Sequence, residues 1–126
     1  MNAYLKDYVK NQNNGSSVTD DPHNIIHVLL KELIKNVKII SVIEQKNSEK
    51  YTHAISRSLT IIFALQDSLD FEKGKKIAEN LFTVYEFSRQ AILHSAEEGQ
   101  KLLTAIHLLE EIESAWAQIA EVAPAA

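Results

Sequence analysis

The apolar residues of this chain repeat at alternating intervals of three and four along four separate stretches. That spacing places them on one stripe of an α-helix, and it is the pattern by which the helices of a bundle pack together. Four such stripes predict an all-α fold, an antiparallel four-helix bundle, with the stripe residues in its core. In chain order the stripes are Ile26, Leu30, Leu33, Val37 and Ile40; Tyr51, Ile55, Leu59, Ile62, Leu65 and Leu69; Ile77, Leu81, Val84, Tyr85, Ser88 and Ile92; and Leu102, Ala105, Leu109, Ile112, Trp116 and Ile119.

Capping and turn residues separate the stripes and set the expected helix ends. An aspartate followed by Pro22 suits a helix start, and Pro124 cannot continue a helix. We expect helices over about 21–45, 48–69 and 74–95, and a fourth from about 99 to just before Pro124. Residues 21–123 then form one bundle domain between a flexible N-terminal arm, 1–20, and a short tail, 124–126. The arm contains a polar run that cannot bury enough surface to order itself, so we expect it to be partly disordered or docked.

Composition excludes several classes of function. The formal charge is −4 and cysteine is absent, which argues against nucleic-acid binding and excludes disulfides and thiolate metal sites. No apolar run approaches the ~20 residues of a membrane span, and the first residues lack the apolar stretch of a signal peptide. We therefore expect a cytoplasmic protein without membrane insertion.

Catalytic patterns are also missing from the sequence. A di-iron bundle needs two Glu-x-x-His motifs, whereas Glu49 with His53 and His107 with Glu110 are single pairs at other spacings. There is no glycine-rich phosphate loop. The acidic residues within 67–72 are explained by helix capping and solvation. We expect no enzyme activity, no cofactor and no metal.

Apolar residues outside the stripes give a second signal. They widen the apolar face of the first helix and flank the stripes of the second and third. Either a wide buried face or an exposed partner-binding surface explains them, and an apolar groove between helices would accept an amphipathic helix. The candidate partner-binding residues are Ile25, Val28, Ile39, Ile43, Phe63, Phe82, Phe87 and Leu93.

The arm carries a short apolar group ahead of its polar run, formed by Tyr4, Leu5 and Tyr8. The polar residues 11–17 form a tether long enough for this group to fold back. We expect the three residues to cover the partner groove while it is empty.

The segment LDFEKGKKIAENL, residues 69–81, joins the second and third stripes and resembles a pattern of the FliS family, the bacterial flagellar secretion chaperones that bind flagellin. Other pieces of the chain resemble the family in the same order, so the resemblance covers about residues 20–119. These pieces are VTDDPHNII at 18–26, ISRSLTIIFAL at 55–65, VYEF at 84–87 and AWAQI at 115–119.

The resemblance implies a cytosolic export chaperone. Such a protein binds the disordered C-terminal segment of flagellin, prevents premature polymerisation and assists delivery to the export gate, and we expect it to be a monomer or weak dimer. The chain departs from the family pattern at LLKELI, 29–34, where an aromatic residue, an acid and a glycine are usual, and at Lys75, where a second glycine is usual. These departures leave open a divergent member that binds another export substrate or a regulator. The remaining alternative, a bundle enzyme or phosphotransfer module, has no motif in its favour.

Overall fold

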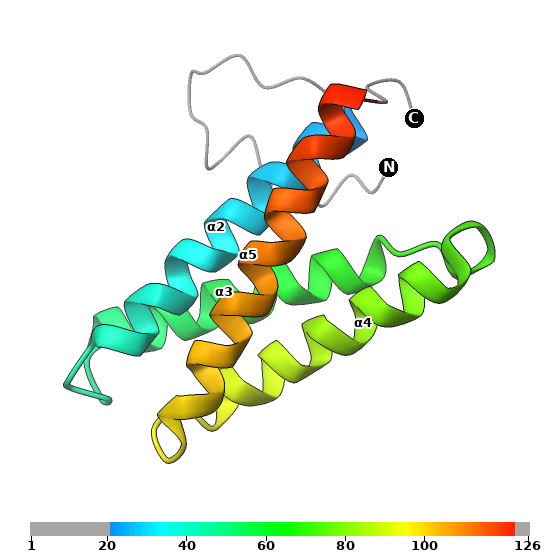
Figure 1. Ribbon diagram of the computed structural model, residues 1–126. Helices are drawn as coiled ribbons and strands as arrows, with labels where there is room; N and C mark the ends of the chain where they lie inside the picture. The colour runs from blue at the N-terminus through cyan, green and yellow to red at the C-terminus, as the bar shows by residue number, and fades with distance from the viewer. Residues whose placement is uncertain (1–20, 123–126) are drawn as a thin grey trace.

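The computed structural model describes residues 21–122, which fold into four helices and, within that range, no strand (Figure 1). Each helix packs against two others, α2 and α4 both lying against α3 and α5. This arrangement confirms the predicted all-α four-helix bundle. Within the described range no helix has the length and apolar character needed to cross a membrane. The helices are α2 (Pro22–Val42), α3 (Glu49–Asp67), α4 (Phe71–Leu93) and α5 (Gly99–Val122).

The arm and the tail lie outside the described residues. The self-capping prediction for Tyr4, Leu5 and Tyr8 therefore falls on a part of the chain that the structure does not describe.

Side-chain caps explain where three of the helices begin. Asp21 accepts a hydrogen bond from the backbone N–H two residues later, at 3.3 Å, and Pro22 occupies the first helical position. Ser48 accepts one from the backbone N–H of Tyr51 at 3.2 Å. Asp70 accepts two, each at 3.0 Å, from the N–H groups two and three residues later. Because Asp70 caps the helix, α4 begins at Phe71, three residues before the predicted start.

A kink interrupts α4 after its first turn. Lys75 adopts φ 47° and ψ −119°. Glycine adopts this conformation more readily than other residues do, because glycine has no Cβ. The preceding Gly74 has a different constraint, since a Cβ there would lie 2.9 Å from the Cβ of Ala78. The chain therefore turns tightly between Asp70 and Ala78, with strain stored at Lys75.

The core is widest on α2, which buries nine residues between α3 and α5. Ile25 is among them, with 1% of its surface exposed. The hypothesis that Ile25 belongs to a partner-binding surface is therefore wrong. Since α2 packs against two neighbours at once, its buried face is wider than a single stripe, and Ile25 lies on the added part.

The two pairs of helices diverge at one end of the bundle. In Figure 1, α2 and α5 run together towards the top, whereas the turn between α3 and α4 extends to the right. The stripes continue into this region, but Ile77 is 70% exposed, Ile119 is 45% exposed and Trp116 is only partly buried. The prediction that Ile77 and Ile119 lie in the core is wrong, whereas Trp116 packs against the core from a half-buried position. A stripe residue is buried only where a facing helix covers it.

Replacing Lys75 with glycine tests the strain at the kink. Glycine adopts this backbone conformation readily, so Lys75→Gly should raise the free energy of unfolding by roughly 1 kcal/mol, as measured by urea denaturation. The matched control is Lys76→Gly, at an exposed position with ordinary helical geometry, which should lower the free energy of unfolding by roughly 1 kcal/mol. Equal destabilisation by both substitutions would show that Lys75 is unstrained.

Candidate partner-binding cleft

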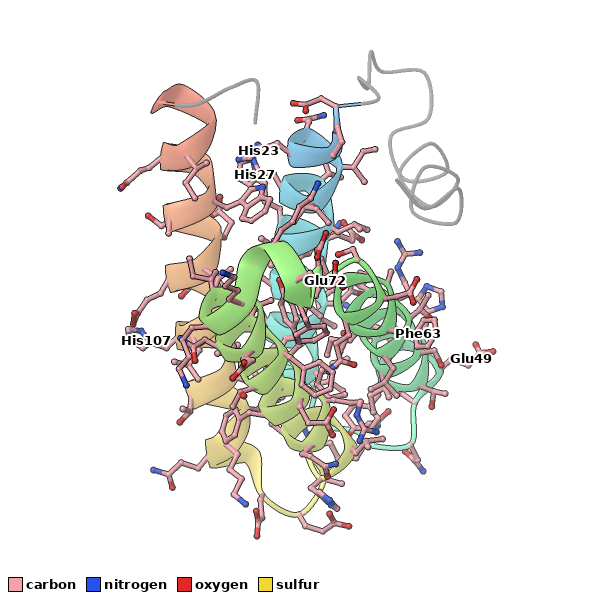
Figure 2. All side chains as sticks on the ribbon, turned by 90° about the vertical axis from the view of Figure 1, so that its right-hand side faces the viewer. His23, His27, Glu49, Phe63, Glu72 and His107 are labelled. Carbon is pink, nitrogen blue, oxygen red and sulfur yellow. The ribbon has the colours of Figure 1, made fainter. Side chains whose placement is uncertain are left out.

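An apolar cleft of about 470 Å³ lies where the two helix pairs diverge. Figure 2 looks towards this end of the molecule and shows His23 and His27 at the start of α2, with Glu72, in the first turn of α4, below them. One wall comes from the start of α2 and the end of α5, and the other from the α3–α4 turn and the first half of α4. The first wall contains Pro22, His23, Ile26, Trp116 and Ile119, and the second contains Leu69, Gly74, Ile77, Ala78, Leu81 and Tyr85.

The second wall is built largely from the segment 69–81, which resembled a family pattern. Its apolar residues Leu69, Ile77 and Leu81 face the cleft because the kink at Lys75 turns the chain at the end of the bundle. Gly74 and Ala78 lie between them and leave room for the cleft. The segment therefore forms a surface as well as a connection.

The first wall is held together by reciprocal hydrogen bonds between the ends of α2 and α5. The indole N–H of Trp116 donates to the backbone carbonyl of His23 at 2.9 Å, and His23 Nε2 lies 2.8 Å from the backbone carbonyl of Trp116. A carbonyl only accepts, so His23 Nε2 carries a proton. The two rings also stack, with centroids 4.9 Å apart and planes inclined by 14°. These contacts fix the indole as a rigid part of the wall.

One turn further along, His27 Nε2 lies 2.6 Å from a carboxylate oxygen of Glu113 and makes a second link between the same two helices. Both links hold α5 against α2, not against α4. They therefore keep this end of the cleft open.

The predicted partner-binding residues lie outside this cleft. Phe63, Phe82 and Leu93 are exposed, and Phe82 packs edge-on against Phe71 with ring centroids 6.1 Å apart. Four other predicted partner-binding residues are half-buried and pack against the core: Val28, Ile39, Ile43 and Phe87.

Surplus apolar residues beside the stripes do not indicate this cleft. The cleft residues Ile77, Leu81 and Trp116 lie on the stripes themselves. The sequence signal for the cleft was the family pattern at 69–81. This pattern falls on a connection between helices, where core packing alone does not require particular residues.

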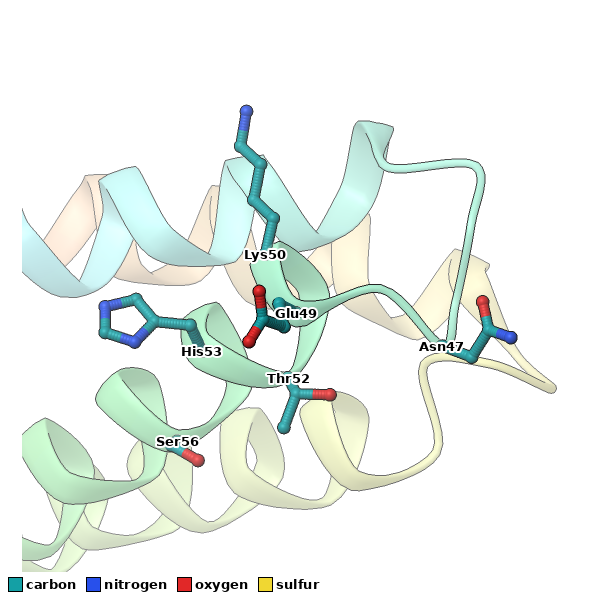
Figure 3. Close-up of a pocket in the computed structure, with 6 residues that line it drawn as sticks. All are labelled: Asn47, Glu49, Lys50, Thr52, His53 and Ser56. Atoms are coloured by element: carbon teal, nitrogen blue, oxygen red, sulfur yellow. The ribbon is translucent and has the colours of Figure 1, made fainter.

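A larger hollow, of about 670 Å³, lies beside the first turns of α3. It is formed by one helix and the loop before it, and in Figure 3 its side chains do not converge, since Lys50 points up and His53 points to the left. A partner there would contact mixed polar groups and bury little apolar surface. The cleft between the helix pairs is therefore the better candidate site.

The residues considered for catalysis do not converge. His107 pairs with Glu111 on the same helix at 2.8 Å, and Figure 2 shows His107 and Glu49 on opposite sides of the molecule. Among the side chains that the structure describes, no three His, Cys, Asp or Glu residues group as a metal site.

Comparisons with known proteins agree with the resemblance seen in the sequence. The family described as Flagellar protein FliS matches residues 1–123 of this chain. The Flagellar secretion chaperone FliS of Vibrio cholerae serotype O1 (strain ATCC 39315 / El Tor Inaba N16961) is 30% identical over 122 residues, covering 94% of this chain and 87% of the relative. The family match extends across the segments that form the two walls of the cleft.

Trp116→Phe tests the link between α2 and α5. Phenylalanine keeps an aromatic ring beside His23 but removes the N–H that donates to the His23 carbonyl. The free energy of unfolding, measured by urea denaturation, should fall by about 1–2 kcal/mol. The control is Leu103→Ala, at an exposed position on the same helix. This substitution should change the free energy of unfolding by less than about 0.5 kcal/mol. An unchanged stability in Trp116→Phe would mean that the hydrogen bond does not hold this wall.

Proposed function

This chain belongs to the FliS family of flagellar secretion chaperones, and on that basis we propose that it binds the C-terminal segment of flagellin in the cytoplasm. Binding keeps the segment from polymerising early and allows its delivery to the export apparatus. The observation that carries the proposal is the open apolar cleft, in whose walls Ile77 and Ile119 stand on core stripes and yet remain exposed.

An amphipathic helix supplied by the partner matches the chemistry of this cleft. The exposed residues Ile77 and Ile119 stand on stripes with helical spacing, so a helix laid between the walls would cover both. Burial of apolar surface supplies the binding energy, and the cost of ordering a disordered segment reduces it. A long segment would continue from the cleft along the exposed Phe63, Phe82 and Leu93, which we propose as further contacts.

The proposed activity is binding alone. The apolar lining of the cleft gives a segment a surface to bury against and needs no cofactor, metal or nucleotide to do so. Release then follows from competition or from hand-over to a component of the export gate. We propose that the protein works as a monomer or weak dimer.

We also propose that the arm covers the cleft while no partner is bound. Pro22 lines the cleft, so the arm leaves the bundle at the rim of the site. Twenty residues span at most about 70 Å when extended, which is ample for a return to the cleft. Tyr4, Leu5 and Tyr8 are the residues that we expect to dock there and to be displaced by the partner.

The departures in α2 support a second candidate, another export substrate or a regulator in place of flagellin. Glu32, at the position where the family usually has glycine, accepts a hydrogen bond from Arg57 at 3.0 Å and another from Asn36. The acid is thus used inside the bundle, linking α2 to α3. Lys31, beside it, is exposed and lines a hollow of about 410 Å³ between α2 and α5. A partner with acidic groups facing Lys31 would make use of this departure from the family pattern.

Ile77→Glu tests the proposed function. A charge on this exposed cleft residue should weaken binding of a synthetic peptide, the flagellin C-terminal segment of the same organism, by more than tenfold, or about 1.4 kcal/mol. The free energy of unfolding should hardly change. The emission of the single tryptophan, Trp116, reports occupation of the cleft.

The matched control for Ile77→Glu is Val42→Glu, which adds the same charge at another exposed apolar residue, 76% exposed at the end of α2 and outside the cleft. It should leave the affinity unchanged. Phe82→Glu tests the proposed continuation along α4. Absence of binding by the unaltered protein would overturn flagellin as the partner, and equal affinities for Ile77→Glu and Val42→Glu would overturn the cleft as its site.

Deletion of residues 1–10 tests the covering arm. The bundle should keep its helical circular dichroism, because its core lies within residues 21–122. Association with the same peptide in stopped-flow measurements should become faster, or the affinity higher, because no intramolecular competitor remains. Unchanged rates and affinity would argue against the covering arm.

A further inference from the structure

Tyr85 is among the most deeply buried residues that line the cleft, with 2% of its surface exposed. Among the described residues its hydroxyl makes no hydrogen bond. The contrast is Tyr51, also buried, whose hydroxyl is hydrogen-bonded to Ser95. A buried tyrosine normally finds a partner for its hydroxyl, so the free group on Tyr85 needs an explanation.

The hydroxyl of Tyr85 is not sealed inside the protein. Within the described part of the chain, Ser58 alone has a side-chain polar atom that is both enclosed and unpaired. The Tyr85 hydroxyl is unpaired too, so it retains contact with solvent, and the cleft is the space that this residue lines. Burial raises its pKa above the ordinary value, so the group stays protonated and remains a donor.

The neighbouring polar side chains of the cleft are already engaged. Asp70 caps α4, the hydroxyl of Ser68 donates to the carbonyl of Leu65, and His23 is bonded to Trp116. These groups shape the walls and are occupied before any partner arrives. Tyr85 differs from them because its polar group has no hydrogen-bond partner at all among the described residues.

We propose that the Tyr85 hydroxyl selects the bound segment by forming a hydrogen bond with a neutral polar side chain, an amide or a hydroxyl, on the segment's otherwise apolar face. This inference rests on the proposed function. When a segment fills the cleft, water leaves, and a hydroxyl without a partner then opposes binding. A wholly apolar segment therefore binds less well than one with a polar group at this position.

The chemical class of that group follows from the geometry of a helix and the cost of burying charge. The backbone groups inside a bound helix are already hydrogen-bonded to one another, so a side chain must supply the partner. A carboxylate or ammonium group would lose more hydration than one hydrogen bond returns. Asparagine, glutamine, serine and threonine satisfy both conditions.

Tyr85→Phe tests the proposal because it removes only the hydroxyl. Titration calorimetry with the synthetic flagellin C-terminal segment should show an affinity about five to ten times lower than that of the unaltered protein. The urea midpoint should stay the same or rise, since no hydrogen bond within the described residues is lost. Tyr51→Phe, the matched control, should lower the urea midpoint and leave the affinity unchanged.

Alanine substitutions at the polar positions of the peptide identify the bonded group. One of these alanine substitutions should weaken binding to the unaltered protein by the same factor as Tyr85→Phe does. The same substitution should not change the affinity of the Tyr85→Phe variant, so the effects of the two substitutions are not additive. If Tyr85→Phe binds as tightly as the unaltered protein while Ile77→Glu does not, the inference is wrong and the proposed function stands. If the unaltered protein does not bind the peptide, both are overturned.

Discussion

The apolar stripes of this protein are longer than the region in which its four helices meet. The wide buried face of α2 packs against α3 and α5 together, and the hydrogen bonds between His23 and Trp116 hold the end of α5 against the start of α2. Since α5 follows α2, it cannot also cover the first half of α4. Ile77 on one side and Ile119 on the other therefore remain exposed, and the cleft follows from this mismatch between the length of the stripes and the length of the shared core.

The opposite wall depends on the backbone of a short turn. Asp70 starts α4 early, Gly74 is confined by the methyl group of Ala78, and Lys75 holds a conformation that glycine would adopt more easily. A regular helix start would direct the following residues differently. The strain at Lys75 is thus associated with the position of Ile77 at the cleft, as backbone strain often is at sites of recognition.

Recognition here combines a broad apolar contact with few polar groups. Apolar burial supplies affinity without direction, whereas a hydrogen bond to a free hydroxyl discriminates between segments of similar hydrophobicity. Tyr85 has that character, and the other polar side chains of the cleft serve to hold its walls. The ion pairs elsewhere, such as Glu32 with Arg57, join helices within the bundle.

Local features of the sequence were sufficient for the helices and for the class of fold. The three-and-four spacing specifies an amphipathic helix, and the caps at Asp21 and Ser48 specify where two of the helices start, because both signals act within a few residues of the chain. The family pattern at 69–81 likewise indicated where to look for function. Burial could not be determined in this way. Ile25 is enclosed and Ile77 is open, although the spacing suggested the reverse. Whether an apolar residue is covered depends on a helix distant in the sequence, and only the tertiary structure decides where the helix pairs meet and where they separate.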